Sequence, residues 1–398
     1  MAYMKKALVF YLYSNRNAGD MAICVGAIEL LRKMGCEITM VSRYGEGEKD
    51  YLESRKYIAR YYPDVKVVPG PFHFDRASSA LAKLKSYALG GLKAVWPFPD
   101  KKLCSLIEPT DIVLFNGGNL LRGESREDYM RLMALFYPVL WSHKLGKKVY
   151  CLPQSTAGIS DQGKRQIRKF LFCCEKVFVR DSISYDKLCV TFPEYRGFCR
   201  STDLAFFLQD FHGDILEAKK DIKSVVAIIL RTTGIGDIGL LPQEITEKML
   251  GILKKWVLRN SDISYVVVVQ TKNDLQVSER FVEELKNSVD IALYEEHDPI
   301  TLHEFYKNVQ YAITMRLHAG ILCMAANRPV VGLFSKQWGL KNPGILGDYD
   351  MPFIMVEDVE EYDFSVLVDA IPENATVRLH EQISEKFTSL QSEFNKIK

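Results

Sequence analysis

Short apolar runs, each followed by a polar turn and a helix-like segment, recur along the 398-residue chain. The first run is uninterrupted, which is typical of a strand buried on both faces of a parallel sheet. The pattern therefore predicts an α/β fold in which strands and helices alternate. In the first half the expected strands are Ala7–Tyr13, Glu37–Ser42, Val65–Pro69, Asp111–Phe115, Lys148–Leu152 and Lys176–Val179.

The alternation stops at the polar segment Asp210–Lys223 and restarts with a strand at Val225–Leu230. A chain of this length exceeds the size at which one hydrophobic core usually stops growing, so two domains are expected. We predict a first parallel α/β domain at 1–209, a linker at 210–223 and a second such domain at 224–374. The remainder, 375–398, carries an amphipathic helix that we expect to cross back to the first domain.

Composition narrows the range of partners. Lys plus Arg number 52 against 50 for Asp plus Glu, and the net charge of +2 predicts no general affinity for nucleic acid. The nine cysteines form no C-x-x-C pair, which favours reduced thiols in the cytoplasm over disulfides or a zinc site. The apolar run near the N-terminus is too short to span a bilayer. We expect a cytoplasmic protein without a metal site.

A basic amphipathic helix is predicted at Ala77–Val95, where Lys83, Lys85 and Lys93 have no acidic neighbours. Such a helix can lie on the anionic inner face of a membrane or hold a phosphorylated acceptor. More often such a helix covers a domain and has a solvated basic face. Peripheral membrane contact is therefore one of two interpretations.

The stretch Tyr311–Ser335 combines an anion-binding geometry with two ionisable groups. It predicts a strand, a helix from Leu317 to Asn327 and a second strand, so Arg316 and His318 come where the first strand meets the helix. The N–H groups and the helix dipole favour an anion there, and the Arg316 fork suits a carboxylate or phosphate. The alternative is that Arg316 makes an ordinary salt bridge and His318 has no chemical role.

Polar residues also follow most of the other predicted strands. Because the carboxyl ends of parallel strands meet at one edge of a sheet, those of the first half should line one cleft. The loops match neither G-x-G-x-x-G nor a Walker motif, so a standard nucleotide cradle is not predicted. Taken singly, some have an ordinary structural explanation, such as Asp20 capping a helix, whereas Arg180 has none. The residues are Asn17, Gly19, Asp20, Asn116, Gly117, Gly118, Gln154, Arg180 and Asp203 in the first half, and Arg231 in the second.

Together and in this order, these motifs resemble the polysaccharide pyruvyl transferase family. The resemblance spans nearly the whole chain, and it departs from the family pattern where Asn119 replaces a third glycine. The matching elements are Asn17-Ala18-Gly19-Asp20, Asn116-Gly117-Gly118, Leu152-Pro153-Gln154-Ser155, Val179-Arg180-Asp181-Ser182, Asp203-Leu204-Ala205, Arg316-Leu317-His318-Ala319, and Pro329-Val330-Val331 with Lys336 after it.

The resemblance implies two Rossmann-like domains facing across a cleft, similar to the glycosyltransferase-B fold, with the site between them. It implies phosphoenolpyruvate as donor, a sugar diol of a capsular or surface polysaccharide as acceptor, and a pyruvate ketal and phosphate as products. It places Arg316, Leu317, His318 and Arg180 around the donor. The acceptor can be a sugar, a lipid-linked oligosaccharide or a polysaccharide, and no cofactor is expected.

The charge of phosphoenolpyruvate fits these residues, since two arginines, a helix N-terminus and Lys336 match a carboxylate and a phosphate. Ketal formation needs an acid and a base. Our hypothesis is that His318 fills this role with Asp20 or Asp203 as its carboxylate partner.

Two other functions fit the same fold. A glycosyltransferase using a nucleotide sugar would need an acidic residue for the ribose, and Glu295 or Glu296 could serve. A non-catalytic sugar-phosphate sensor would bind without turnover.

Overall fold

A computed structural model places residues 4–71, 100–211, 225–234, 239–360 and 362–396. The predicted basic helix and most of the predicted linker lie outside these described residues. The contacts between Cα atoms divide the chain into two compact units. Unit 1 comprises Met1–Asn15, Ile23–Leu204 and Ser389–Lys398, and unit 2 comprises Arg16–Ala22 and Ala205–Thr388.

Unit 1 contains a parallel sheet with the strand order β3-β2-β1-β4-β6-β7-β8, and β5 pairs with β6 beside this path. The central strands β1 and β4 are almost wholly apolar and buried, as the uninterrupted runs predict. The strands are β1 (Lys5–Leu12), β2 (Cys36–Ser42), β3 (Lys66–Val68), β4 (Ile112–Phe115), β5 (Gly118–Gly123), β6 (Val149–Ile159), β7 (Lys176–Val179) and β8 (Phe198–Arg200).

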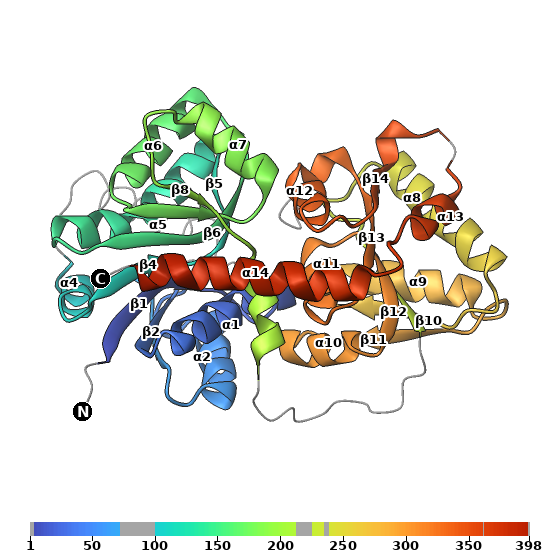
Figure 1. Cartoon of the computed structure of the whole chain (residues 1–398), viewed down its shortest axis with the longest axis horizontal. Coiled ribbons are helices and arrows are strands. Elements are labelled where there is room, and N and C mark those ends of the chain that lie inside the picture. Colours follow the sequence, from blue (N-terminus) through green and yellow to red (C-terminus); the bar gives the residue numbers. More distant parts are fainter. Residues whose placement is uncertain (1–3, 72–99, 212–224, 235–238, 361, 397–398) are drawn as a thin grey trace. The chain divides into compact units, whose positions relative to one another are not determined.

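Helices cover both faces of this sheet. In Figure 1, α1 and α2 lie on one face, while α5 and α6 lie on the other. The direction of the chain across the sheet reverses between β1 and β4, which is why the helices change face there. The helices are α1 (Ala18–Lys33), α2 (Lys49–Tyr61), α4 (Lys101–Ile107), α5 (Arg126–Lys144), α6 (Asp161–Phe172) and α7 (Ser182–Thr191).

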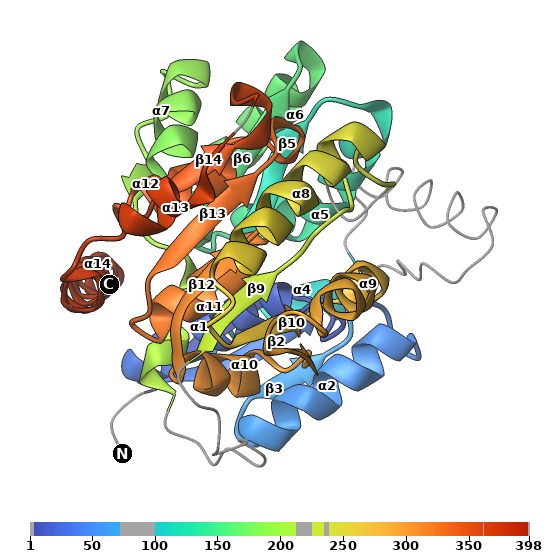
Figure 2. The same ribbon diagram turned by 90° about the vertical axis from the view of Figure 1, so that its right-hand side faces the viewer.

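Unit 2 repeats this plan with a parallel sheet of order β11-β10-β9-β12-β13-β14. Figure 2 shows α8, α9 and α13 on one face of the sheet and α10, α11 and α12 on the other. The strands are β9 (Val225–Ile229), β10 (Tyr265–Val269), β11 (Ile291–Glu295), β12 (Val309–Thr314), β13 (Val330–Phe334) and β14 (Phe353–Met355). The helices are α8 (Gln243–Arg259), α9 (Leu275–Leu285), α10 (Pro299–Tyr306), α11 (Leu317–Ala325), α12 (Lys341–Gly347) and α13 (Phe364–Asp369), with 3-10 turns η1 (Leu204–Asp210), η3 (Lys272–Asp274), η4 (Lys336–Trp338) and η5 (Val356–Asp358).

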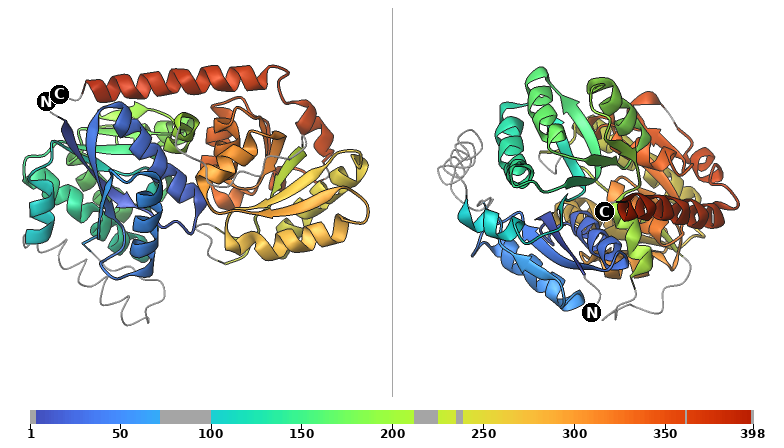
Figure 3. Two further views of the ribbon diagram at one scale, coloured as in Figure 1. Left: turned by 90° about the horizontal axis from the view of Figure 1, so that it is seen from below. Right: turned by 60° about the vertical axis from the view of Figure 1, so that its left-hand side comes forward.

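The last helix, α14 (Ala375–Asn395), is continuous along its whole length (Figure 3). Its residues up to 388 belong to unit 2, where the ring of Phe387 stacks on that of Phe207 at 3.9 Å. Its later residues belong to unit 1, where Phe394 stacks on Phe178 at 4.8 Å. Among the described residues, no helix has the length and apolar character that a bilayer crossing requires.

Two parallel α/β units confirm the predicted fold class, and some local predictions are wrong. The segment after Leu152 is not a loop, because β6 continues to Ile159 and pairs with β5 there. The sequence suggested no strand at β5, since its two glycines resemble a turn. Finally, the residue that caps α1 is Asn17 rather than Asp20, because the Asn17 side chain accepts a hydrogen bond from the N–H of Gly19 at 2.9 Å.

Candidate functional site

Several of the predicted site residues lie at the points where the strand order of each sheet reverses. In unit 2, β9 and β12 are neighbours, and Arg231 and Arg316 follow their carboxyl ends. In unit 1, β1 and β4 are neighbours, and the Asn116-Gly117-Gly118 loop follows β4. Doubly wound sheets bind ligands at such positions, because the helices diverge there and leave a crevice.

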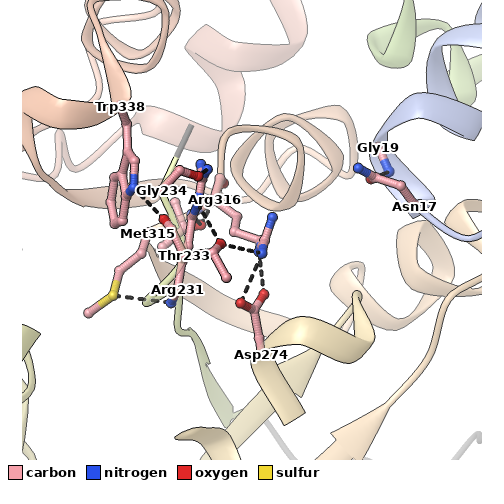
Figure 4. Close-up of polar contacts among 10 residues, drawn as sticks. Asn17, Gly19, Arg231, Thr233, Gly234, Asp274, Met315, Arg316 and Trp338 are labelled. Atoms are coloured by element: carbon pink, nitrogen blue, oxygen red, sulfur yellow. Dashed lines mark hydrogen bonds and ion pairs between the residues drawn. The ribbon is translucent and has the colours of Figure 1, made fainter. Parts of the chain in front are cut away.

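Arg316 is fixed at the start of α11 by its backbone and by its side chain. The Thr314 hydroxyl accepts a hydrogen bond from the Arg316 N–H at 3.0 Å and donates one to the Arg316 carbonyl at 2.7 Å. The guanidinium forms a two-point ion pair with Asp274, through Nε and through Nη2, which lies 2.8 Å from Oδ1 (Figure 4). Only 9% of the Arg316 side chain and 2% of the Asp274 side chain are exposed. This pair orients the arginine rigidly.

Arg231 lies beside Arg316 and is held by an aromatic ring. Its guanidinium carbon is 4.8 Å from the centre of the Trp338 ring, and the Trp338 Nε1–H donates to the Thr233 carbonyl at 2.9 Å. The Thr233 hydroxyl accepts from Arg231 Nε at 3.4 Å and from Arg316 Nη2 at 3.5 Å (Figure 4). Two cationic side chains thus flank one hydroxyl at the edge of the sheet.

His318 belongs to the first turn of α11 and touches Gly19. The N-cap residue of this helix, Arg316, makes no side-chain cap, and the N-terminus of a helix favours an anion. A Cβ atom added at Gly19 would lie 2.2 Å from His318 Nδ1, hence only glycine allows this approach. Gly19 and Asn17 precede the second turn of α1 and belong by their contacts to unit 2.

The structure places the other predicted residues of unit 2 as follows. Leu317 is buried at the start of α11, and Asp20 is half-buried in the first turn of α1. Lys336 follows β13 and is 57% exposed, and its ammonium pairs with Asp358. Its backbone N–H donates to the Glu357 carboxylate at 3.0 Å. The ion-pair partner of Lys336 is therefore exposed to solvent, whereas the ion-pair partner of Arg316 is buried.

In unit 1 the Asn116 and Gln154 side chains hold the glycine loop. Asn116 Nδ2 donates to the Tyr11 carbonyl at 2.9 Å, and its Oδ1 accepts from the Gly117 N–H at 2.8 Å. Gln154 Nε2 donates to the Asn116 carbonyl, and its Oε1 accepts from the Leu120 N–H at 3.2 Å. Both side chains are fully buried. They shape the loop, and the backbone of the loop is what a ligand would approach.

Gly117 and Gly118 of this loop each require glycine, for different steric reasons. A Cβ atom at Gly117 would lie 2.8 Å from the Pro153 carbonyl oxygen. Gly118 has a φ of 139°, a backbone conformation that other residues rarely adopt, and its α-carbon faces the Tyr13 hydroxyl. Asn119 follows without a positive φ, so the loop does not need a third glycine there.

Arg180 and Asp203 form a buried ion pair in unit 1, with 1% of each side chain exposed. Ser155 links this pair to Asp181, since its hydroxyl accepts from Arg180 Nε at 2.7 Å and donates to Asp181 Oδ2 at 2.6 Å. Asp181 also caps α7 by accepting from the Ser184 N–H at 2.7 Å. Burial raises the pKa of Asp181, and the bonds from Ser155 and Ser184 oppose that rise.

Sequence reasoning missed several partners in this arrangement. Asp274, Thr233 and Trp338 were not singled out, although each lies in the segment that follows a strand of its sheet. Asp274 had the clearest signal, because it is a carboxylate in the polar turn after an unbroken apolar strand, the same rule that selected Arg180. Within the described ranges, no three His, Cys, Asp or Glu side chains are grouped to hold a metal ion.

Glu295 and Glu296, considered for a ribose, have local partners. Glu295 Oε1 lies 2.8 Å from His297 Nε2. Glu296 Oε1 accepts from the N–H groups of His297 and Asp298 at 2.7 and 2.9 Å. The Glu296 carboxylate thus stabilises the turn after β11.

Comparison with known proteins gives one family and one fold. The family model described as polysaccharide pyruvyl transferase matches residues 17–333. No curated protein matches the chain.

Among solved structures, Anabaena Alr3699/HepE in complex with UDP is similar with a TM-score of 0.56 and 10% identity, over 99% of each chain. The Neisseria meningitidis UDP-GlcNAc 2-epimerase bound to UDP-GlcNAc has a TM-score of 0.54 and 12% identity, over 94% of each chain. For S. aureus MnaA with UDP the TM-score is 0.52 and the identity 14%, over 96% of this chain and 91% of the other. At these identities the likeness shows the fold alone, which is the predicted glycosyltransferase-B kind with two Rossmann-like domains.

Proposed function

The chain belongs to the polysaccharide pyruvyl transferase family, and from this premise we propose that it moves pyruvate from phosphoenolpyruvate to a sugar diol as a ketal, releasing phosphate. The observation that best supports this reaction is the group formed by Arg316, Asp274 and His318 at the start of α11. At this point a guanidinium oriented by Asp274, the N-terminus of a helix and an imidazole lie together.

The charges of this group suit the proposed donor. Phosphoenolpyruvate carries a carboxylate and a phosphate, and an arginine fork binds either through two hydrogen bonds. Hydrogen bonds to Asp274 fix the orientation of the Arg316 guanidinium. Arg231 adds a second positive charge beside Thr233. The N-terminus of α11 completes an environment that favours an anion.

The reaction needs two proton movements. As the two acceptor hydroxyls bond to C2 of phosphoenolpyruvate, one hydroxyl proton goes to the methylene carbon, which becomes a methyl group. The C2–O bond to phosphate breaks, and the other hydroxyl proton leaves with the phosphate. We assign His318 to this transfer as the acid and base group.

Asp20 is the better candidate for the carboxylate partner of His318. It follows Gly19, whose backbone touches the imidazole, whereas the Asp203 carboxylate is engaged by Arg180 inside unit 1. In this proposal Arg180 and Asp203 shape the strand ends of unit 1. The Gly117-Gly118 backbone, which a ligand can approach closely, serves the acceptor.

The alternative is a glycosyltransferase that uses a nucleotide sugar, which is favoured by solved structures of similar fold that hold UDP. It is disfavoured by the engagement of Glu295 and Glu296 with their own turn. A non-catalytic sensor would bind phosphoenolpyruvate without releasing phosphate.

A phosphate-release screen separates these functions. The chain is incubated with phosphoenolpyruvate and a panel of galactose, mannose, glucose and N-acetylhexosamine acceptors in free, phosphorylated and lipid-linked form. We expect acceptor-dependent phosphate release that His318→Ala abolishes. His380→Ala, at an exposed position of α14, is the matched control and should keep the wild-type rate. Release that persists in the His318 variant would remove the catalytic role, and binding without release would favour the sensor.

A further inference from the structure

Three arginines gather in unit 1 outside the residues considered so far. Arg43 follows β2, Arg122 is on β5, and Arg131 is in the second turn of α5. Arg131 Nη2 donates to the Arg122 carbonyl at 3.3 Å. Burial, together with the charges of Arg122 and Arg43, lowers the pKa of Arg131 to about 10, so Arg131 remains cationic at neutral pH.

One carboxylate, that of Asp128, lies near two of these arginines and already accepts other hydrogen bonds. Asp128 Oδ1 is 3.4 Å from Arg122 Nε and 3.4 Å from Arg131 Nη2, longer than a charge-assisted hydrogen bond. Its Oδ2 forms the capping box of α5 with the Ser125 N–H. Among the described residues, the buried Nε atoms of Arg122 and Arg131 have no hydrogen-bond acceptor. Buried donors on cations are normally satisfied, and a bound anion can supply the acceptor that the described residues lack.

Arg122 of this cluster shares strand β5 with the glycine loop, and it follows Gly118 by four residues. The Tyr13 hydroxyl donates to the Gly117 carbonyl at 2.8 Å, and Tyr13 is also close enough to Arg131 to act on its charge. A ligand at the Gly117-Gly118 backbone would therefore have the cationic cluster beside it. Arg316 and Arg231, assigned above to the donor, belong to unit 2.

We propose that Arg122 and Arg131, with Arg43 beside them, bind a phosphate group on the acceptor. Phosphate fits better than a carboxylate, because its three oxygens and its second charge can serve both guanidinium groups at once. The acceptor would then be a sugar linked to a phosphate or diphosphate. Identifying this ligand as the acceptor rests on the proposed transfer reaction, whereas the phosphate site itself does not.

Binding of inorganic pyrophosphate without phosphoenolpyruvate tests the phosphate site. Titration calorimetry compares the wild type with Arg122→Gln, Arg131→Gln and the control Arg168→Gln. Arg168 is 50% exposed on α6 and pairs with Glu194. We expect wild-type affinity in the control and at least about tenfold weaker binding in the other two, the effect of losing one charge-assisted contact. If Arg131→Gln fails to fold, the binding measured for Arg122→Gln, at the more exposed position, decides the test. Equal binding by all four proteins would overturn the proposal.

Kinetics with matched acceptors then tests the assignment to the acceptor. One sugar is offered as methyl glycoside, 1-phosphate, nucleotide diphosphate sugar and short-chain prenyl diphosphate sugar, and the last two distinguish a soluble from a lipid source. We expect a lower acceptor KM for the phosphate-bearing forms, lost in Arg122→Gln with the phosphoenolpyruvate KM unchanged. Equal KM values for all four forms, or a raised phosphoenolpyruvate KM in the variant, would refute the assignment. Pyrophosphate binding without any pyruvyl transfer would refute the proposed function and leave the phosphate site standing.

Discussion

Replacing Asp274 by alanine should leave the Arg316 guanidinium buried without its counter-ion. The pair is 9% and 2% exposed and is joined by two hydrogen bonds. Removing one partner of a buried ion pair usually lowers the free energy of unfolding by about 3–5 kcal/mol, and two charge-assisted bonds at about 1.5–3 kcal/mol each agree with this range. We expect Asp274→Asn, which keeps one acceptor oxygen, to lose less.

The matched control is Asp358→Ala, which breaks the ion pair of Lys336 in the same unit. Those side chains are 53% and 57% exposed, so the expected loss is only about 0–1 kcal/mol. Urea unfolding followed by tryptophan fluorescence, to which Trp256 and Trp338 of unit 2 contribute, measures the difference. Folded Asp274→Ala protein should also show a raised KM for phosphoenolpyruvate. If Asp274→Ala and Asp358→Ala unfold at the same urea concentration, the buried pair does not hold the site together.

Two further predictions concern unit 2. Gly19→Ala places a methyl group 2.2 Å from His318 Nδ1 and should slow turnover by about tenfold to a hundredfold. The control Gly251→Ala, at a position with open space around it, should keep the wild-type rate. Equal rates for the two variants would show that the imidazole moves aside freely. Hydrogen bonds from His303 and Lys307 lower the pKa of Glu304 to about 2. The ionised carboxylate therefore stabilises the fold fully above pH 4.5, and this contribution is lost as the pH falls through 2. Glu304→Gln should therefore make the urea midpoint depend less on pH over this range, and an unchanged slope would contradict this cause.

The sequence predicted the junction at Arg316 correctly because the signals there are local. A β-branched strand, an Ala- and Leu-rich segment and Arg328-Pro329 define strand, helix and stop within one short stretch. The partner of Arg316 is not local. Asp274 lies 42 residues earlier, and only the order of β10, β9 and β12 in the sheet brings it to the guanidinium.

The segment after Leu152 shows where local signals mislead. Pro153, Ser155 and Gly158 favour a turn, yet β6 continues through them because β5 pairs with it from Gly118 onward. Arg180 illustrates the same limit. Its place at the end of β7 was predictable, but its engagement with Asp203 depends on the chain returning beside β7 through β8.

The most direct test of the proposed reaction is the structure of its product. The chain is incubated with phosphoenolpyruvate and the best acceptor of the panel, and the acceptor is then analysed by mass spectrometry and carbon NMR. We predict an acceptor heavier by pyruvate less water, a quaternary ketal carbon bonded to two sugar oxygens, and one phosphate released per product. Phosphate release with an unmodified acceptor, or transfer of a sugar in place of pyruvate, would contradict the proposed function.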